Sequence, residues 1–504
     1  MDSSNIKNLI NYAYEYLGLH KDDELYIRNR LLEACFMEEY EDHIPQDKLL
    51  DVTNLDYPDS IINPILDELI ETGKIQEENR EYYLCKIMDI ISLRPSEIEN
   101  KFNELSKEST EKAFKWLHSY SEHNSYIKLS DIRKNLRWFV DDEKGGLEIT
   151  INLSKPEITN TAVKKALNKP KANYPKCVIC PENMGYAGHG TTRQNLRGHN
   201  ITLGGDPWFW QFSPYAYFNE HGIAINYAHT PMVVEEKNIT NVLDFVDYVP
   251  EYFIGFNAAL PIIGGSILAH DHYQGGRCRL PIFNSKDKYL FKHNDYPNVK
   301  VSILNWYNSV IRLESTSRDE IEALGKKLVM SWKSYDDLDN NILAKSDVQH
   351  NSITCITRYE NKYILDLILR NNVTSEEHPD GIYHAHSEYH NIKKEAIGLI
   401  EAGGMFILPA RLKRQLGVVS SYLQANTFDT NDIKDDMLVH KDMVTKLIDE
   451  NGIGHSEAKA NDIVKLEIER ICRQILFNTA VYKDTEKGNK SFIDFMCSND
   501  LYLL

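Results

Sequence analysis

The residues best suited to chemistry in this 504-residue chain are two histidines and a glutamine that alternate along one stretch: His270, His272 and Gln274. In an extended backbone, residues two apart point to the same face, so we expect these three side chains to line one surface. Glycine pairs bracket the stretch at residues 264–265 and 275–276. Glycine lets a bulky anion approach the main chain closely. The pattern therefore predicts a site for a phosphate group.

The chemistry that this pattern favours is nucleophilic attack on phosphorus. A neutral imidazole is an unprotonated nucleophile near physiological pH, because its usual pKa is about 6.5. Attack through one ring nitrogen leaves a cation whose other N–H needs an acceptor, such as a backbone carbonyl. The amide of Gln274 can donate to a phosphoryl oxygen without adding charge, which suits a transfer catalysed by positioning and electrostatics. The competing interpretations are a metal site and a strand with two incidental histidines.

A second group with chemical potential is the pair Cys177 and Cys180. Two thiolates separated by two residues can share a tetrahedral metal, and zinc is the natural guess. A Cys2His2 zinc finger would also need two histidines spaced by three to five residues, whereas His189 and His199 are ten apart. Further ligands must therefore come from farther along the chain. The alternative is a pair of buried, reduced cysteines.

Residues 260–270, together with the His-x-His-x-Gln motif that they lead into, resemble the galactose-1-phosphate uridylyltransferases, a branch of the histidine-triad superfamily. They resemble the second, bacterial class more closely than the first. The resemblance covers residues 145–504. It implies that His272 is the nucleophile and that Gln274 contacts the phosphoryl group. It also implies an α+β fold with two histidine-triad-like halves, each an antiparallel sheet with packed helices, plus an N-terminal helical region.

The same resemblance extends to metal ligands. In that family the cysteine pair binds zinc together with a histidine of a following strand and the first histidine of the motif, which correspond here to His221 and His270. His229 is a competing ligand. A structural zinc ion is therefore expected, held by Cys177, Cys180, His221 and His270.

Further substrate contacts are implied more weakly. The glycine-rich stretch 185–197 resembles the family's loop ahead of the nucleotide site, so Arg193 and Asn195 are predicted to contact the nucleotide, with an ordinary surface loop as the alternative. Asn257 precedes the motif by a spacing close to that of the family's phosphate-contacting asparagine. Ser266 stands four residues before the first histidine where the first class has three, so it contacts phosphate or shapes the glycine turn.

A faint repeat of the motif lies at His384 and His386, with Glu388 replacing the glutamine. Such an echo is what a duplicated fold would leave. In the first class the corresponding histidines help to bind a second, structural metal. A hydrogen-bonded substrate contact is an equal competitor for both histidines.

The elements that must position these residues can be placed coarsely. Apolar residues recur at helical spacing in the N-terminal segments 25–39, 60–72, 95–105 and 110–118. Alternation predicts strands over 147–153, 351–358 and 363–370, and a helix is predicted over 393–402. We expect a mainly helical region at 1–165, a first half with the nucleotide and nucleophile site at 166–330, and a second half with C-terminal helices at 331–504.

The overall charge constrains the partners. A formal net charge of −18 argues against nucleic acid or an anionic membrane as the main partner. No stretch approaches the roughly 18 to 20 uninterrupted apolar residues of a membrane span. The first twenty residues carry Asp2 and Glu15 and no continuous apolar core, so no signal peptide is expected and the protein is expected in the cytoplasm.

The function that the resemblance implies is transfer of UMP between hexose 1-phosphates. His272 would attack the α-phosphorus of UDP-glucose, expel glucose 1-phosphate, and pass UMP to galactose 1-phosphate to form UDP-galactose. Two displacements imply ping-pong kinetics. The alternatives are a histidine-triad nucleotide phosphorylase or hydrolase, and a non-catalytic, zinc-stabilised nucleotide-binding module. The first class completes its active site across a dimer interface, so a homodimer is one expected arrangement.

Overall fold

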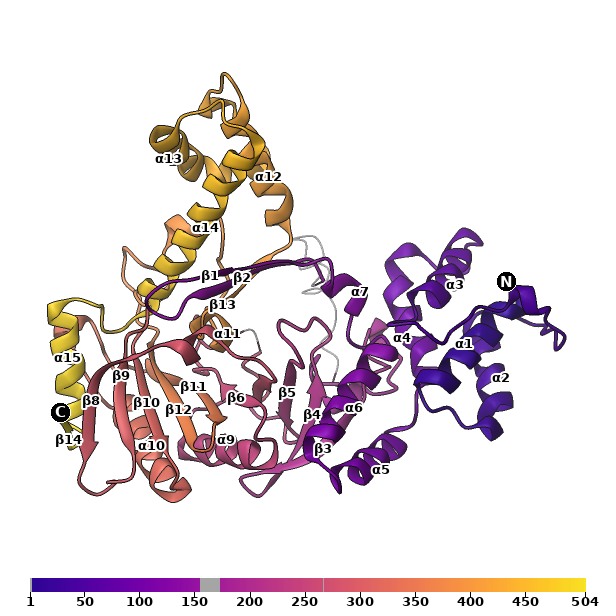
Figure 1. The fold of residues 1–504 in the computed structure, drawn as a ribbon, viewed down its shortest axis with the longest axis horizontal. Coiled ribbons are helices and arrows are strands. Elements are labelled where there is room, and N and C mark those ends of the chain that lie inside the picture. Colours follow the sequence, from indigo (N-terminus) through magenta and orange to yellow (C-terminus); the bar gives the residue numbers. More distant parts are fainter. Residues whose placement is uncertain (1, 155–172, 266) are drawn as a thin grey trace. The chain divides into compact units, whose positions relative to one another are not determined.

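The computed structural model describes residues 2–154, 173–265 and 267–504 (Figure 1). The chain divides into two compact units that are interleaved in sequence. The first unit contains Met1–Lys134, Asn160–Thr230 and His270–Arg277. The second contains Asn135–Thr159, Pro231–Ala269 and Cys278–Leu504.

The first unit begins with helices, as the apolar spacing predicts. They are α1 (Ser3–Tyr16), α2 (Glu24–Ala34), α3 (Asp59–Glu71), α4 (Arg80–Ile91), α5 (Pro95–Ser106), α6 (Thr110–His123) and α7 (Leu129–Ile132). Local chemistry defines their starts. The Asp2 carboxylate accepts the Ser4 N–H at 3.1 Å and so caps α1. At α5, Pro95 occupies the first helical position, and the Glu97 carboxylate accepts the Arg94 N–H at 2.8 Å.

The rest of the first unit is an antiparallel sheet in the order β7-β5-β4-β3. Its strands are β3 (Gly198–Leu203), β4 (Asp206–Phe212), β5 (Gly222–Asn226) and β7 (His272–Gly276). Tyr273 is fully buried and stacks on Trp208 with 4.7 Å between ring centroids. Gly276 ends β7 with φ +154°, and a Cβ there would lie 2.4 Å from the Glu220 carbonyl oxygen. Only glycine therefore fits at that position.

The second unit contains two sheets. The smaller has the order β1-β2-β13, from β1 (Leu136–Val140), β2 (Leu147–Asn152) and β13 (Met405–Pro409), and β13 runs parallel to β2. The larger has the order β14-β8-β9-β10-β12-β11-β6 within this unit. Its strands are β6 (Phe253–Phe256), β8 (Asp287–His293), β9 (Lys300–Leu304), β10 (Val310–Ser315), β11 (Asn351–Tyr359), β12 (Tyr363–Asn371) and β14 (Leu501–Leu503). The strand predictions for 147–153, 351–358 and 363–370 are confirmed.

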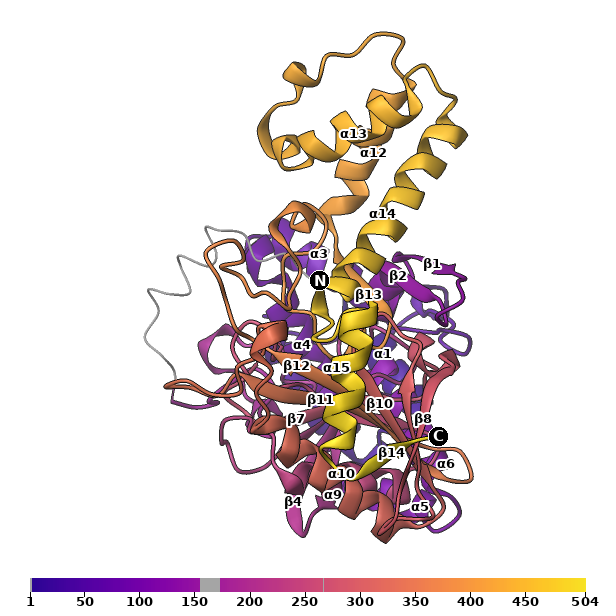
Figure 2. The same cartoon turned by 90° about the vertical axis from the view of Figure 1, so that its left-hand side faces the viewer.

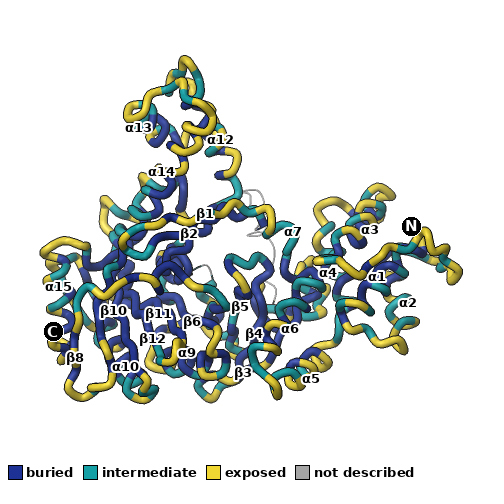
Figure 3. The backbone as a smooth tube through the Cα atoms, in the orientation of Figure 1, coloured by how far each residue is buried: buried dark blue, intermediate teal, exposed yellow. Residues whose placement is uncertain are grey.

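Helices of the second unit are α9 (Glu236–Tyr248), α10 (Arg318–Lys333), α11 (Leu399–Ala402), α12 (Arg411–Gln424), α13 (Lys441–Asn451), α14 (Glu457–Thr479) and α15 (Glu486–Cys497). Helices α9 and α10 contact each other and β11, and the strands that they cover are largely buried (Figure 3). Helices α12, α13 and α14 lie together (Figure 1, Figure 2). The α+β class is confirmed. None of the helices among the described residues has the length and apolar character that a membrane crossing requires.

The helix predicted over 393–402 is wrong for most of its length, because only α11 is helical there. Gly398 stands at the start of α11. The buried Lys393 ammonium donates to the Glu401 carboxylate and to the Ile407 carbonyl, both at 3.0 Å. These tertiary hydrogen bonds hold Lys393 in an irregular segment that local apolar spacing does not reveal.

The predicted division into three regions stays a prediction. The boundary at 165/166 lies outside the described residues, and the boundary at 330/331 falls inside α10. The two observed units instead exchange segments along the chain, since residues 231–269 belong to the second unit and residues 270–277 to the first.

A buried ionic group organises the larger sheet. Asp366 of β12 is fully buried, and its two oxygens accept hydrogen bonds from Arg312 Nε at 2.5 Å and Arg312 Nη2 at 2.9 Å. Arg358 Nη1 donates to Asp366 Oδ2 at 2.9 Å. Burial alone would raise the pKa of Asp366, but attraction to Arg312 and Arg358 outweighs it and holds the pKa below its usual value.

Replacing Asp366 with asparagine is expected to destabilise the second unit by about 3–5 kcal/mol, because two buried guanidinium groups lose their counter-charge. Urea unfolding measures the loss. The matched control is Asp500→Asn, which removes an exposed carboxylate paired with Lys327 and is expected to cost much less. Equal losses in the two variants would contradict the prediction.

Candidate active site

The nucleophile predicted by the motif, His272, is the first residue of β7 and is 6% exposed. Its Nδ1 lies 2.7 Å from the main-chain carbonyl oxygen of His270. A carbonyl can only accept a hydrogen bond, so Nδ1 carries the proton and Nε2 carries a lone pair. Nε2 has no hydrogen-bond partner among the residues that the structure describes. Burial lowers the pKa of His272, which favours the neutral, nucleophilic ring.

Gln274 lies two residues along β7, so its side chain shares a face with His272. Its Oε1 is 3.3 Å from Nε2 of His221, whose Nδ1 is 3.4 Å from the Tyr217 N–H. Because Nδ1 of His221 accepts the Tyr217 N–H, Nε2 of His221 carries the ring proton. Nε2 therefore donates to the side-chain oxygen of Gln274. Burial lowers the pKa of His221 to about 4, so this ring stays neutral. The amide NH2 of Gln274 is therefore the end that can donate to a phosphoryl oxygen.

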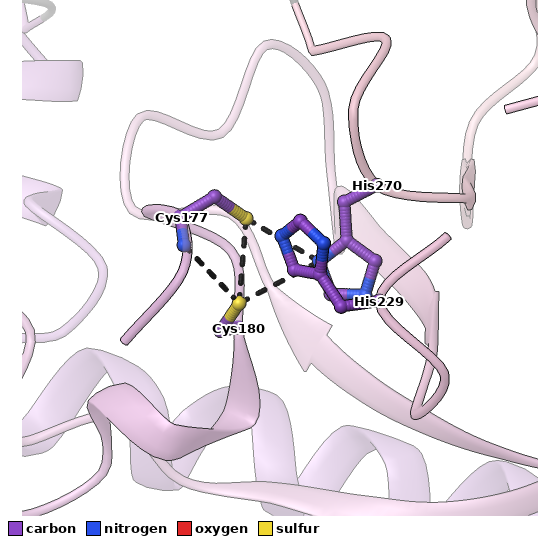
Figure 4. Close-up of side chains that lie close together, drawn as sticks. All are labelled: Cys177, Cys180, His229 and His270. Carbon is purple, nitrogen blue, oxygen red and sulfur yellow. Dashed lines mark hydrogen bonds between the residues drawn. The ribbon is translucent and has the colours of Figure 1, made fainter. Parts of the chain in front are cut away.

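The two cysteines lie beside the first histidine of the motif (Figure 4). The Sγ atoms of Cys177 and Cys180 are 3.4 Å apart, and they lie 3.3 Å and 3.6 Å from His270 Nδ1. His270 Nε2 donates to the Asn226 carbonyl at 2.7 Å, which leaves the Nδ1 lone pair facing the sulfurs. The hydrogen bond from Cys180 lowers the pKa of the Cys177 thiol, so Cys177 is the first of the pair to ionise.

The fourth member of this group is His229. One ligand atom from each of Cys177, Cys180, His229 and His270 lies within 4.8 Å of the others. The His229 and His270 ring centroids are 4.1 Å apart, and His229 Nε2 is buried without a hydrogen-bond partner among the described residues. Two sulfurs and two imidazole nitrogens are the donor set of a tetrahedral zinc site. The Asn226 carbonyl is the outer-shell acceptor that orients such a ligand.

The fourth member of the candidate metal group is thus His229, the competing ligand, and His221 does not belong to the group. His221 lies immediately before β5, where its ring is held between the Tyr217 N–H and Gln274. His229 lies three residues beyond the end of β5, in the segment whose Thr230 carbonyl accepts the Asp271 N–H at 2.8 Å. That contact brings His229 beside His270. The structure therefore replaces His221 with His229 in the candidate metal centre.

The residues predicted to contact the nucleotide make internal contacts in the first unit. Arg193 Nη1 donates to the Tyr126 hydroxyl at 2.8 Å. Asn195 is fully buried, and it exchanges 2.8 Å hydrogen bonds with Asn124, each side-chain amide donating to the other residue's carbonyl. The assignment of Arg193 and Asn195 to nucleotide binding stays a prediction.

The remaining predicted contacts fall in the second unit or outside the described residues. Asn257 follows β6 and accepts the Leu399 N–H through Oδ1 at 2.7 Å. Gly265 has φ +85°, and a Cβ there would lie 3.1 Å from Asn257 Nδ2. Ser266 lies outside the described residues.

The second histidine pair also lies in the second unit. His386 Nε2 donates to the Ile382 carbonyl at 3.1 Å, and its ring stacks on His378 with centroids 3.9 Å apart. His384 is 3% exposed, and neither ring nitrogen has a partner among the described residues. Neither histidine belongs to a metal-binding group in the described part of the chain, where the Cys177 group is the one found.

The chain is similar in sequence to known proteins over nearly its whole length. Residues 33–231 match the N-terminal domain of galactose-1-phosphate uridyl transferase, and residues 217–428 match the C-terminal domain. The galactose-1-phosphate uridylyltransferase of Caldanaerobacter subterraneus subsp. tengcongensis is 39% identical, with 97% of this chain and 96% of the relative covered. That of Fusobacterium nucleatum is 37% identical, with 97% of each covered. That of Staphylococcus carnosus is 36% identical, with 97% and 98% covered.

Among solved structures, yeast Ap4A phosphorylase Apa2 aligns with a TM-score of 0.32 and 11% identity, over 64% of this chain and 90% of that one. This score is too low to carry an argument about the fold. The sequence matches carry the assignment instead. The chain is a nucleotidyltransferase. It belongs to the galactose-1-phosphate uridyl transferase family.

Proposed function

We propose that this chain transfers UMP from UDP-glucose to galactose 1-phosphate, giving UDP-galactose and glucose 1-phosphate. The observation that carries the proposal is the hydrogen bond from His272 Nδ1 to the His270 carbonyl. It fixes the tautomer that presents a lone pair on Nε2, and it gives the developing imidazolium an acceptor for its remaining proton.

The transfer takes place in two displacements. In the first, Nε2 forms a bond to the α-phosphorus of UDP-glucose. The bond from that phosphorus to the bridging oxygen breaks, and glucose 1-phosphate leaves with the electron pair. In the second, a phosphate oxygen of galactose 1-phosphate attacks the same phosphorus, and the N–P bond breaks to restore neutral His272. The amide NH2 of Gln274 stabilises the phosphoryl oxygens in both steps.

The group Cys177, Cys180, His229 and His270 is suited to a structural zinc ion. When bound, the ion would supply a fixed anchor for the His270 side chain. His270 in turn places its own carbonyl against His272. The metal group is thus proposed to orient His272, the nucleophile, through His270.

Mass spectrometry after brief exposure to UDP-glucose tests the proposal. We expect an acid-labile increment of UMP on the peptide that contains His270 and His272. Labelled galactose 1-phosphate should then appear as labelled UDP-galactose. Release of the nucleotide to phosphate or water instead would favour a phosphorylase or hydrolase. Absence of any exchange between UDP-glucose and labelled glucose 1-phosphate would favour a non-catalytic binding module.

Replacing Gln274 with glutamate is expected to slow UMP transfer by about 10² to 10³-fold, the usual cost of one lost oxyanion donor. The new carboxylate would also repel the phosphoryl oxygens. Exchange of labelled glucose 1-phosphate into UDP-glucose measures the rate. Gln46→Glu makes the same charge change at an exposed position of the first unit and should leave the rate unchanged. A Gln274→Glu protein with undiminished exchange would contradict this role of the amide.

The substrates of this proposal are small phosphorylated sugars and a nucleotide sugar, so neither nucleic acid nor a membrane takes part in it. The cytoplasmic location of the protein and the homodimer expected from the resemblance stay predictions. Sedimentation equilibrium of the purified chain would check the second of these.

A further inference from the structure

The second unit contains a buried arginine, Arg370, that makes no hydrogen bond to a carboxylate among the described residues. Arg370 of β12 is fully buried, and its Nη1 donates to the Ile397 carbonyl at 2.9 Å. Its Nε and Nη2 have no hydrogen-bond partner among the described residues. Leaving buried N–H groups of a charged side chain unpaired is costly. Burial accordingly lowers the pKa of Arg370 to about 10.

The same sheet shows how a buried arginine is normally satisfied. Arg312 and Arg358 both bind Asp366, which lies four residues before Arg370 on the same strand and the same face. The acid that attracts Arg370 is Glu401. Its oxygens already accept hydrogen bonds from the Lys393 ammonium at 3.0 Å and the Gly398 N–H at 3.2 Å. Nε and Nη2 of Arg370 therefore remain without an acceptor in the part of the chain that the structure describes.

Two other buried polar side chains of the second unit, His384 and Thr354, lack hydrogen-bond partners among the described residues. His384 is 3% exposed, and neither ring nitrogen has a partner with hydrogen-bond geometry among the described residues. Burial and, after it, the charge of Arg370 lower the pKa of His384 to about 4. Thr354 of β11 is fully buried, and its Oγ1 also lacks a partner in the described part of the chain. The register pairs Thr354 with Ile368 and Ser352 with Arg370, so Thr354 and Arg370 point to the same face of the sheet.

The donor set defines the ligand. The Nε and Nη2 edge of a guanidinium binds two oxygens of one oxyanion side by side. The hydroxyl of Thr354 and the imidazole N–H of His384 are further donors suited to the oxygens of an oxyanion. A carboxylate has two oxygens and would leave donors unused, whereas a tetrahedral phosphate offers enough acceptors for all three side chains.

We propose that Arg370, Thr354 and His384 form a binding site for a phosphate group, supplied either as inorganic phosphate or as the phosphate of a hexose 1-phosphate. The second source rests on the proposed function. Because Arg370 and Thr354 are fully buried and His384 is 3% exposed, the site must open before a phosphate can enter. The site assigns a role to Arg370 and Thr354, which the sequence motifs do not mark.

Calorimetric titration of the full chain with inorganic phosphate, glucose 1-phosphate and acetate, each alone, tests the site. We expect phosphate or glucose 1-phosphate to bind and acetate not to bind. Arg370→Lys should weaken binding by about 10 to 100-fold, since it removes the bidentate edge and keeps the charge. Thr354→Val, which keeps the shape and removes the hydroxyl, should weaken it about fivefold.

The control is Thr357→Val, on the opposite face of β11, where the hydroxyl contacts Cys355 Sγ at 3.4 Å. It should leave phosphate affinity unchanged. Unaltered affinity in Thr354→Val, an equal effect in Thr357→Val, or equal binding of acetate would overturn the proposal. Thr354→Val keeps the test decisive if Arg370→Lys does not fold.

Comparing the affinity for glucose 1-phosphate with the affinity for inorganic phosphate distinguishes the two sources of phosphate. Tighter binding of glucose 1-phosphate than of inorganic phosphate indicates a sugar phosphate site, and the reverse indicates a site for free phosphate. Titration of His272→Ala separates this proposal from the proposed function. Binding that persists in that variant and depends on Thr354 supports the phosphate site even if UMP transfer is never observed.

Discussion

Replacing His272 with alanine is expected to reduce UMP transfer by a factor on the order of 10⁴ to 10⁶, as removal of a covalent nucleophile or its partners does in other enzymes. The variant has no nitrogen that can bond to phosphorus, so neither half of the reaction can use a covalent intermediate. Exchange of labelled glucose 1-phosphate into UDP-glucose measures the first half, and mass spectrometry measures the UMP increment on the protein.

The matched control for this variant is His20→Ala, which removes an exposed histidine of the first unit. It is expected to retain full exchange and the full UMP increment. Circular dichroism and thermal unfolding of both proteins separate lost chemistry from lost folding. A His272→Ala protein that still exchanged glucose 1-phosphate at the wild-type rate would remove the proposed nucleophile and with it the mechanism.

Replacing His229 with alanine is expected to weaken zinc binding by at least about 100-fold. Loss of an outer-shell partner alone costs about 10 to 100-fold, and His229 is proposed as a direct ligand. The purified wild-type chain should carry zinc that resists a chelator, and the variant should lose it. Because metal binding stabilises the folded state, the variant's unfolding temperature should also fall.

His221→Ala is the matched control, since it removes another buried histidine of the first unit that lies outside the metal group. It should keep its zinc against the same chelator, and its defect should appear in UMP transfer through Gln274. Retention of zinc by His229→Ala together with loss by His221→Ala would contradict the geometry of the cluster. A wild-type chain without affinity for zinc would contradict the metal centre itself.

Local pattern was enough to predict that His272 and Gln274 share one face of a strand, and the role of His272 as nucleophile stays a prediction. Alternation along residues 270–274 predicted one shared face for His270, His272 and Gln274; β7 has that arrangement for His272 and Gln274, but it begins after His270. The two-residue spacing of Cys177 and Cys180 likewise predicted a shared metal group. Both predictions depend on neighbours in sequence, where backbone periodicity alone determines which side chains meet.

Predictions that depended on distant parts of the chain were less secure. His221 and His229 flank the same short strand, and which of them reaches His270 depends on the pairing of Thr230 with Asp271. The same limit applies to Arg370, which sits in a strand of apolar residues. Its Nε and Nη2 lack a partner among the described residues, while the Glu401 carboxylate accepts hydrogen bonds from Lys393 and Gly398. Which of these groups binds the Glu401 carboxylate depends on tertiary packing, which local sequence does not show.

The interleaving of the two units has a consequence for the order in which the protein is made. Synthesis delivers Cys177, Cys180 and His229 to the first unit, but the ribosome must then extend the chain through residues 231–269 of the second unit before His270 and β7 emerge. Domains commonly fold as they leave the ribosome. Until then the nascent first unit lacks one member of the candidate metal group and one strand of its sheet, and residues 270–277 supply both.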